Sequence, residues 1–122
     1  MGLQFENLVL NNIQPIAELI GPGRTSLLGA APYFQRTTTQ QKACQIDLLM
    51  QTKHSLYVAE VKNRRKIEYS VINEVREKID RLSPARNQSV RTVLVYEGVL
   101  DAHIETEGFF DFIIPFAQLL KL

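Results

Sequence analysis

Two carboxylates and a lysine lie within a pair of apolar runs, where charged side chains are uncommon. Asp47 interrupts the run CQIDLLM, and Glu60 and Lys62 stand at the end of the run LYVAEVK. Charge in the interior of a β-sheet is rare unless it is paired or binds a metal ion. These three residues are therefore the first candidates for chemistry.

A predicted β-hairpin would bring the three residues together. The two apolar runs flank a polar turn, Lys53-His54, which indicates antiparallel strands. A two-residue turn places Asp47 opposite Glu60, and such opposed residues share a face with Cβ atoms about 4.5–5.5 Å apart. Lys62 shares this face because side chains alternate along a strand. A register shifted by one residue would instead place Asp47 and Glu60 on opposite faces.

The predicted cluster has two interpretations. Adjacent carboxylates repel each other unless a cation lies between them. A hard ion such as Mg²⁺ takes one or two protein carboxylates, with water and phosphate oxygens as its other ligands. A lysine nearby could hold a phosphate oxygen or help to deprotonate a metal-bound water. The other interpretation is an ordinary salt bridge from Lys62 to Glu60 or Asp47 on a solvated sheet face.

Charge is distributed unevenly along the chain, although the net charge is only +1. Residues 62–91 carry nine basic side chains against four acidic ones, whereas residues 92–122 carry one basic side chain against five acidic ones. A basic segment beside carboxylates would suit a phosphate-backbone partner. A solvated surface with ion pairs along a helix would explain the same charges.

Composition indicates a single globular domain. The 122 residues are 45% hydrophobic and 22% charged, which suits one ordinary core. The sequence has no apolar run near the roughly 18 residues of a membrane span and no signal peptide. A lone cysteine, Cys44, excludes an internal disulfide and favours a reducing compartment. Because the only histidines, His54 and His103, are far apart, a Cys/His zinc site cannot be assembled within the chain. We expect a cytoplasmic protein without a membrane partner.

Hydrophobic periodicity predicts an α-β-β-β-α-β order with a short tail. Within the second helix, Glu74 and Lys78 have the i,i+4 spacing of an ion pair on the solvent side. The predicted elements are a helix over 2–20 kinked near Pro15, strands over 33–39, 44–52 and 56–62, a helix over 69–82, a strand covered on both faces over 91–96, a short helix near 99–106, a strand over 109–114 and a closing helical turn through Leu122.

This ordered combination resembles the PD-(D/E)XK nuclease superfamily, the fold of restriction endonucleases and archaeal Holliday junction resolvases. Asp47 is followed, after twelve residues, by Glu60-Val61-Lys62 on the second and third predicted strands. The opening GLQFENLVLNN is similar to the first helix of the superfamily, where a glutamate matching Glu6 often joins the active site. Ile46 stands where the superfamily commonly has proline. The resemblance implies a restriction endonuclease-like αβββαβ core, with a mixed central sheet flanked by helices.

A narrower similarity is to the C-terminal domain of archaeal-type AAA+ ATPases. It is carried by FENLVLNNI, CQIDLLMQTKHSLYVAEVKNRR and GFFDFIIPFAQLL. In those proteins a P-loop module and a winged helix precede a domain of this kind, and this sequence contains neither. We therefore expect one nuclease-like domain over 1–122, as a C-terminal fragment of a larger ATPase whose N-terminal module would be its partner.

The resemblance implies a metal-dependent DNA phosphodiesterase. Asp47 and Glu60, with the carbonyl of Val61, would bind Mg²⁺ or Mn²⁺. Lys62 would position or activate the attacking water, and Glu6 would orient that water or assist a second ion. The DNA backbone would be bound by Arg64, Arg65, Lys66 and Arg76.

Two other hypotheses remain open. The domain could bind DNA or a partner without cutting, because appended domains of this kind can be degenerate. It could also serve as a homodimerisation or docking domain of the parent ATPase, through the phenylalanines of its C-terminal segment. Phenylalanines with this pattern are more typical of a core. The residues concerned are Phe109, Phe110, Phe112 and Phe116.

Overall fold

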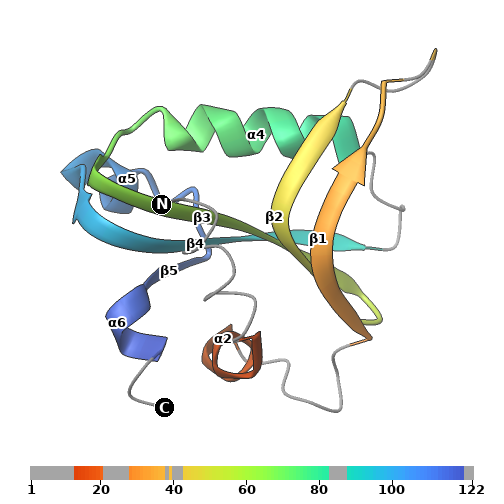
Figure 1. Ribbon diagram of the computed structural model, residues 1–122, viewed down its shortest axis with the longest axis horizontal. Coiled ribbons are helices and arrows are strands. Elements are labelled where there is room, and N and C mark those ends of the chain that lie inside the picture. Colours follow the sequence, from red (N-terminus) through yellow and green to blue (C-terminus); the bar gives the residue numbers. More distant parts are fainter. Residues whose placement is uncertain (1–12, 21–27, 38, 40–42, 83–87, 120–122) are drawn as a thin grey trace.

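Helices cover both faces of a mixed β-sheet (Figure 1). The computed structural model describes residues 13–20, 28–37, 39, 43–82 and 88–119. The α/β class predicted from the sequence, a mixed central sheet flanked by helices, is confirmed. The elements are α2 (Ile13–Ile20), β1 (Gly29–Gln35), β2 (Cys44–Gln51), β3 (Ser55–Ile67), α4 (Val71–Leu82), β4 (Ser89–Leu100), α5 (Ala102–Glu107), β5 (Phe112–Pro115) and α6 (Phe116–Leu119).

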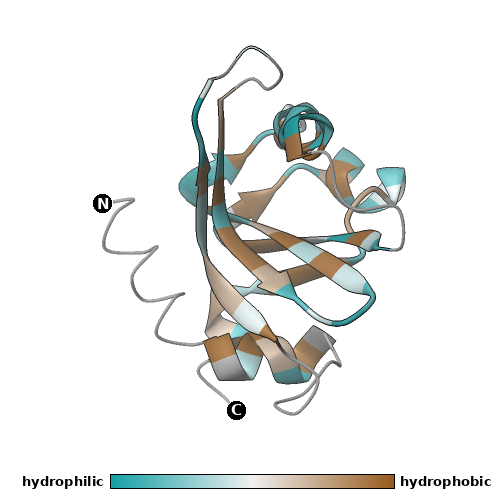
Figure 2. Ribbon diagram, turned by 90° about the vertical axis from the view of Figure 1, so that its right-hand side faces the viewer, coloured by the Kyte–Doolittle hydropathy of each residue, from teal (hydrophilic) through white to brown (hydrophobic). Residues whose placement is uncertain are grey.

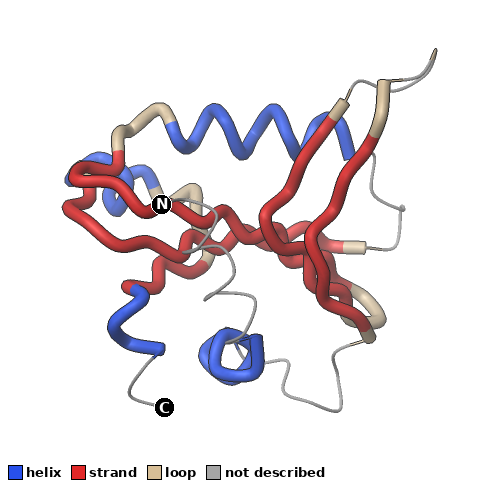
Figure 3. Tube along the Cα trace, in the orientation of Figure 1, coloured by secondary structure: helices blue, strands red, loops and turns tan. Residues whose placement is uncertain are grey.

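The strands form one sheet in the order β1-β2-β3-β4-β5. Both β1 and β3 pair with β2 antiparallel, whereas β3–β4 and β4–β5 are parallel pairs. Parallel neighbours cannot be joined by a tight hairpin, and α4 provides the crossover between β3 and β4. Figure 3 shows this helix lying along one side of the sheet, opposite α2 and α6.

Apolar side chains form two buried clusters that include residues from different helices. One cluster contains Ile16 of α2 and Phe116 of α6, and the other contains Val75 of α4 and Ile104 of α5. In Figure 2, which views α4 nearly end-on, the hydrophobic side of this helix is turned towards the sheet. Ile72 and Val75 are buried there, and Ile79 and Leu82 pack against the same cluster.

The centre of β4 is buried on both faces over residues 92–95, as its unbroken apolar run predicts. The phenylalanines near the C-terminus also belong to the core. Phe110 and Phe116 are buried, and Phe109 and Phe112 pack against the two clusters. Their packing agrees with the core role that is typical of phenylalanines with this pattern.

The observed ends of the strands differ most from the predicted ends where pairing with a neighbouring strand overrides local composition. The first strand was predicted over 33–39 but spans Gly29–Gln35, because Gly29, Ala30 and Ala31 pair with the end of β2. The third strand continues past the predicted residue 62 to Ile67, since its exposed charged end pairs with the end of β4. Strand propensity is weaker than such pairing.

The predicted opening helix is described only in part. Residues 13–20 are helical and include Pro15, near which the kink was predicted. Residues 1–12, and with them Glu6, lie outside the described residues. None of the helices formed by the described residues is long and apolar enough to cross a membrane.

Candidate active site

The hairpin of β2 and β3 has the predicted register. The paired positions run from Gln51 opposite Leu56 to Leu48 opposite Ala59, and the turn is closed by the Thr52 N–H, which donates to the Ser55 carbonyl at 2.9 Å. The pairing ends there, and the next residues along the two strands are Asp47 and Glu60.

At Asp47 a side chain replaces the backbone in the hydrogen bonding between β2 and β3. The backbone N–H of Val61 donates to Oδ2 of Asp47 at 2.9 Å. On the other side of β2, Ala31 pairs with Leu49 but Tyr33 pairs with Ile46, so two residues of β2 oppose the single residue Pro32. This is a β-bulge, a feature that re-aims side chains and is frequent beside active sites.

The bulge explains how an aspartate fits into an apolar run. Before it, Cys44 and Ile46 pack in the cluster beneath α4, and after it Leu48 and Met50 pack in the cluster with α2. The strand therefore changes the face to which its apolar side chains point. Asp47 lies at this change, where its side chain binds a backbone group that the ladder leaves unpaired.

Glu60 is buried beneath α4 and held by a lysine of that helix. Its side chain is 3% exposed, and both carboxylate oxygens accept hydrogen bonds from Nζ of Lys78, each at 3.0 Å. Burial, together with the hydrogen bond and charge of Asp47, raises the pKa of Glu60 to about 8, although the Lys78 ammonium opposes this change. At neutral pH the carboxyl group of Glu60 therefore retains its proton.

Burial lowers the pKa of Lys78, but the charge and hydrogen bond of Glu60 outweigh this effect, and the pKa is raised overall. Lys78 thus stays a cation beside Glu60 throughout the neutral range. Both Glu60 oxygens are therefore already in contact with a cation.

Lys62 lies on the same face of β3 as Glu60, and its ion-pair partner differs from the two that the sequence predicted. Its side chain is 14% exposed, and Nζ lies 2.9 Å from Oε2 of Glu74. The sequence predicted either a role in catalysis or a salt bridge to Glu60 or Asp47, and the observed partner is on α4 instead. Lys62 is thereby held against α4, two residues along β3 from Glu60.

The prediction that Glu74 and Lys78 pair on the solvent side of α4 is wrong. Glu74 and Lys78 reach down to Lys62 and Glu60 on β3, so that the site consists of the three predicted residues and two from the helix. Sequence reasoning missed these two because charged residues on an amphipathic helix are normally assigned to the wet side. The i,i+4 spacing was the available signal.

The predicted DNA-binding residues fall into two groups. Arg64, Arg65 and Lys66 are exposed near the end of β3, where a register shift against β4 forms a second bulge. Arg76 is engaged on α4, since its guanidinium lies 3.7 Å from Glu107 and 5.0 Å above the ring centre of Phe109.

Gly98 is required by the second bulge. Its φ is 130°, and a Cβ at this position would collide with the backbone oxygen of Arg64. Only glycine combines this backbone conformation with so close an approach of the neighbouring strand. The exposed arginines are thus presented by a specific backbone geometry.

The donor set near Asp47 is small. Within the described residues, no three or more His, Cys, Asp and Glu side chains are grouped so that they could hold a metal ion. The two candidate carboxylates are Asp47 and Glu60. Val61, whose carbonyl was predicted as a further ligand, is buried and anchored through its N–H to Asp47.

Neither the protein-family models nor the curated proteins contain a match to this sequence. What is shown is an α/β protein with a mixed five-stranded sheet and a buried charged cluster beneath its crossover helix.

Proposed function

We propose that this chain is a metal-dependent DNA phosphodiesterase domain with the restriction endonuclease-like αβββαβ core. One observation carries the proposal: the carboxyl groups of Asp47 and Glu60 converge on one face of the hairpin, and Lys62 lies on the same strand two residues further on. A strongly perturbed pKa in a buried carboxylate is more frequent at functional sites than elsewhere.

The chemistry of these groups fits a hard divalent cation. Two oxygen ligands lie side by side, and their mutual repulsion contributes to the raised pKa of Glu60. A cation between them would remove that cost, and carboxylate oxygens are preferred ligands of Mg²⁺ and Mn²⁺. Such an ion supplies a water of lowered pKa and charge neutralisation at the phosphate.

Each residue of the cluster has a distinct role in the proposal. Asp47 and Glu60, with the Val61 carbonyl, hold the cation. Lys62 positions the attacking water or a phosphate oxygen, and its contact with Glu74 fixes the ammonium in place. Lys78 donates to both oxygens of Glu60 in the metal-free protein, and a cation that binds Glu60 would replace these contacts.

Incubation with supercoiled plasmid and branched DNA in Mn²⁺ tests the proposal. The wild type should cut, and Asp47→Asn and Glu60→Gln should not. Glu18→Gln, which changes an exposed carboxylate on α2, is the matched control and should cut normally. In parallel, Mn²⁺ should raise the melting temperature of the wild type but not of Asp47→Asn, because a ligand bound only by the native state stabilises it. A wild type that fails to cut at high enzyme excess would refute the enzymatic proposal.

A second candidate function is DNA binding without cleavage. The observation in its favour is the Lys78 ammonium, which binds both oxygens of Glu60 where a metal ion would otherwise bind. Under this alternative, DNA affinity falls with salt but does not change in Asp47→Ala. The plasmid assay, together with the DNA affinity of the wild type and Asp47→Ala measured at several salt concentrations, separates the two functions.

A further inference from the structure

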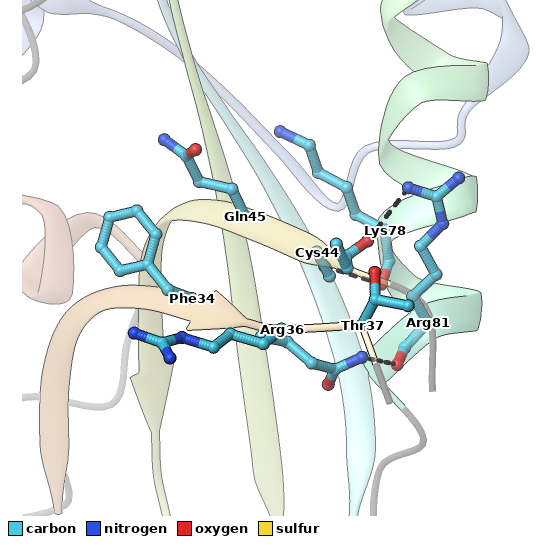
Figure 4. Close-up of a pocket in the computed structure, with 9 residues that line it drawn as sticks. Phe34, Arg36, Thr37, Cys44, Gln45, Lys78 and Arg81 are labelled. Atoms are coloured by element: carbon cyan, nitrogen blue, oxygen red, sulfur yellow. Dashed lines mark hydrogen bonds between the residues drawn. The ribbon is translucent and has the colours of Figure 1, made fainter. Parts of the chain in front are cut away.

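A groove of about 800 Å³ lies where the end of β1, the start of β2 and the last turns of α4 meet (Figure 4). Three of its lining side chains are cationic: Arg36 next to β1, and Lys78 and Arg81 on α4. None of the described residues that line it is acidic. The groove therefore favours an anionic ligand.

An exposed aromatic ring lies at the same groove. Phe34 is 69% exposed, although large apolar side chains are usually covered. Its pairing partner on β2 is Gln45, another exposed lining residue. Figure 4 shows the Phe34 ring and the Arg36 guanidinium extending in the same direction, as expected for side chains two residues apart along an extended chain.

The framework of the groove is held by hydrogen bonds that do not use Phe34 or Arg36. Nε2 of Gln35 donates to the Arg81 carbonyl at 2.8 Å, and Nη1 of Arg81 donates to the Ala43 carbonyl at 3.1 Å. These bonds tie the β1–β2 ribbon to the last turns of α4. Arg36 forms no ion pair with an acidic residue of the described part of the chain.

The groove is continuous with the candidate active site through one residue. Lys78 lines the groove, and its ammonium lies 3.0 Å from the Glu60 carboxylate. A ligand in the groove would therefore approach the charged cluster.

From the charge and the exposed ring, we infer that this groove binds single-stranded nucleic acid, with a base stacked on Phe34 and a backbone phosphate on Arg36. An aromatic ring beside cations is the pattern of single-strand recognition, because every base offers a face for stacking. In a duplex the base faces are already stacked on each other and cannot cover the ring. A run of acidic residues alone would satisfy the arginine but would offer no aromatic face to the phenylalanine.

The inference rests on the proposed function for its nucleic-acid partner but requires neither metal nor cleavage. Fluorescence anisotropy in EDTA tests it, with a labelled oligo-dT of about 12 nucleotides and a duplex of equal length. Phe34→Ala should weaken single-strand binding at least about five-fold and leave duplex binding unchanged. Arg36→Gln should reduce the slope of log affinity against log salt by about 0.7.

Matched controls lie outside the groove. Val99→Ala shortens another exposed apolar side chain, and Lys53→Gln removes an exposed charge at the β2–β3 turn. Both should bind as the wild type does. Single-strand binding that is unchanged in Phe34→Ala and Arg36→Gln, or reduced equally by the controls, overturns the inference.

The outcome is independent of the cleavage assay. Phe34-dependent binding by a protein that never cuts DNA would refute the proposed enzyme and support the groove. If the wild type cuts DNA but Phe34→Ala binds single strands normally, the proposed enzyme is supported and the role of the groove is refuted.

Discussion

The buried carboxyl of Glu60 should make the protein less stable as the pH rises. The pKa of Glu60 is about 8 in the folded protein, against an ordinary value of 4.5. Between these values the folded state holds a proton that the unfolded state has released. The slope of the unfolding free energy against pH is proportional to the number of protons bound by the unfolded state minus the number bound by the folded state. This difference is negative here, so stability falls as the pH rises. The contribution is therefore fully present below about pH 4.5 and is lost as the pH rises towards 8.

The size of this effect follows from the same two values. Each pKa unit corresponds to about 1.4 kcal/mol, so the difference amounts to roughly 5 kcal/mol. No discount for solvent screening is needed, because the Glu60 side chain is 3% exposed. A domain of this kind has a total unfolding free energy of only about 5–15 kcal/mol, so the change should be easy to measure.

Urea denaturation of the wild type and Glu60→Gln at intervals from pH 5 to pH 9 tests this prediction. Glutamine resembles the protonated acid, so the two proteins should be similarly stable at pH 5, and the variant should be clearly more stable at pH 9. All other titrating groups are common to both, so the difference between the curves isolates Glu60. The raised pKa of Lys78 lies above this range and adds nothing within it.

Parallel curves for the two proteins would refute the reasoning. They would mean that Glu60 is ionised over the whole range and forms an ordinary salt bridge with Lys78. In that case Glu60→Gln would also be the less stable protein at every pH, since it would leave the lysine without its counter-ion.

Two further predictions concern neighbouring parts of the structure. Lys78→Met removes the cation that opposes the rise in the Glu60 pKa, so the loss of stability should extend to higher pH than in the wild type. Urea denaturation above pH 8 measures this loss. An unchanged pH profile would contradict the Glu60–Lys78 contact. Gly98→Ala should destabilise the protein by about 2 kcal/mol or more, because its φ of 130° and the Arg64 oxygen leave no room for a Cβ. A urea midpoint equal to that of the wild type would show that the second bulge can relax.

The arrangement of the hairpin could be predicted because it depends on local chemistry. The Lys53-His54 turn and the apolar alternation around it set the register, which the structure has. The bulge at Asp47 depends on how β1 pairs with β2, and nothing within β2 itself indicates that Pro32 will lie opposite two residues. Long-range pairing of this kind leaves no periodic signal in either strand. The groove beside Phe34 was missed for a similar reason, since it joins segments more than 30 residues apart in sequence.

The inward direction of the α4 charges has a simple geometric explanation. The turn after β3 is short, so α4 runs back over the strand, and its earlier residue Glu74 lies over Lys62 while Lys78 lies over Glu60. Two residues of a strand advance about 6.6 Å and four residues of a helix about 6 Å, so the spacings of the two charge pairs match. Glu-x-Lys on the strand and Glu-x-x-x-Lys on the helix are therefore complementary when the two run in opposite directions. An isolated α4 would pair Glu74 with Lys78, and packing over the hairpin exchanges that exposed pair for two contacts that hold the candidate site in place.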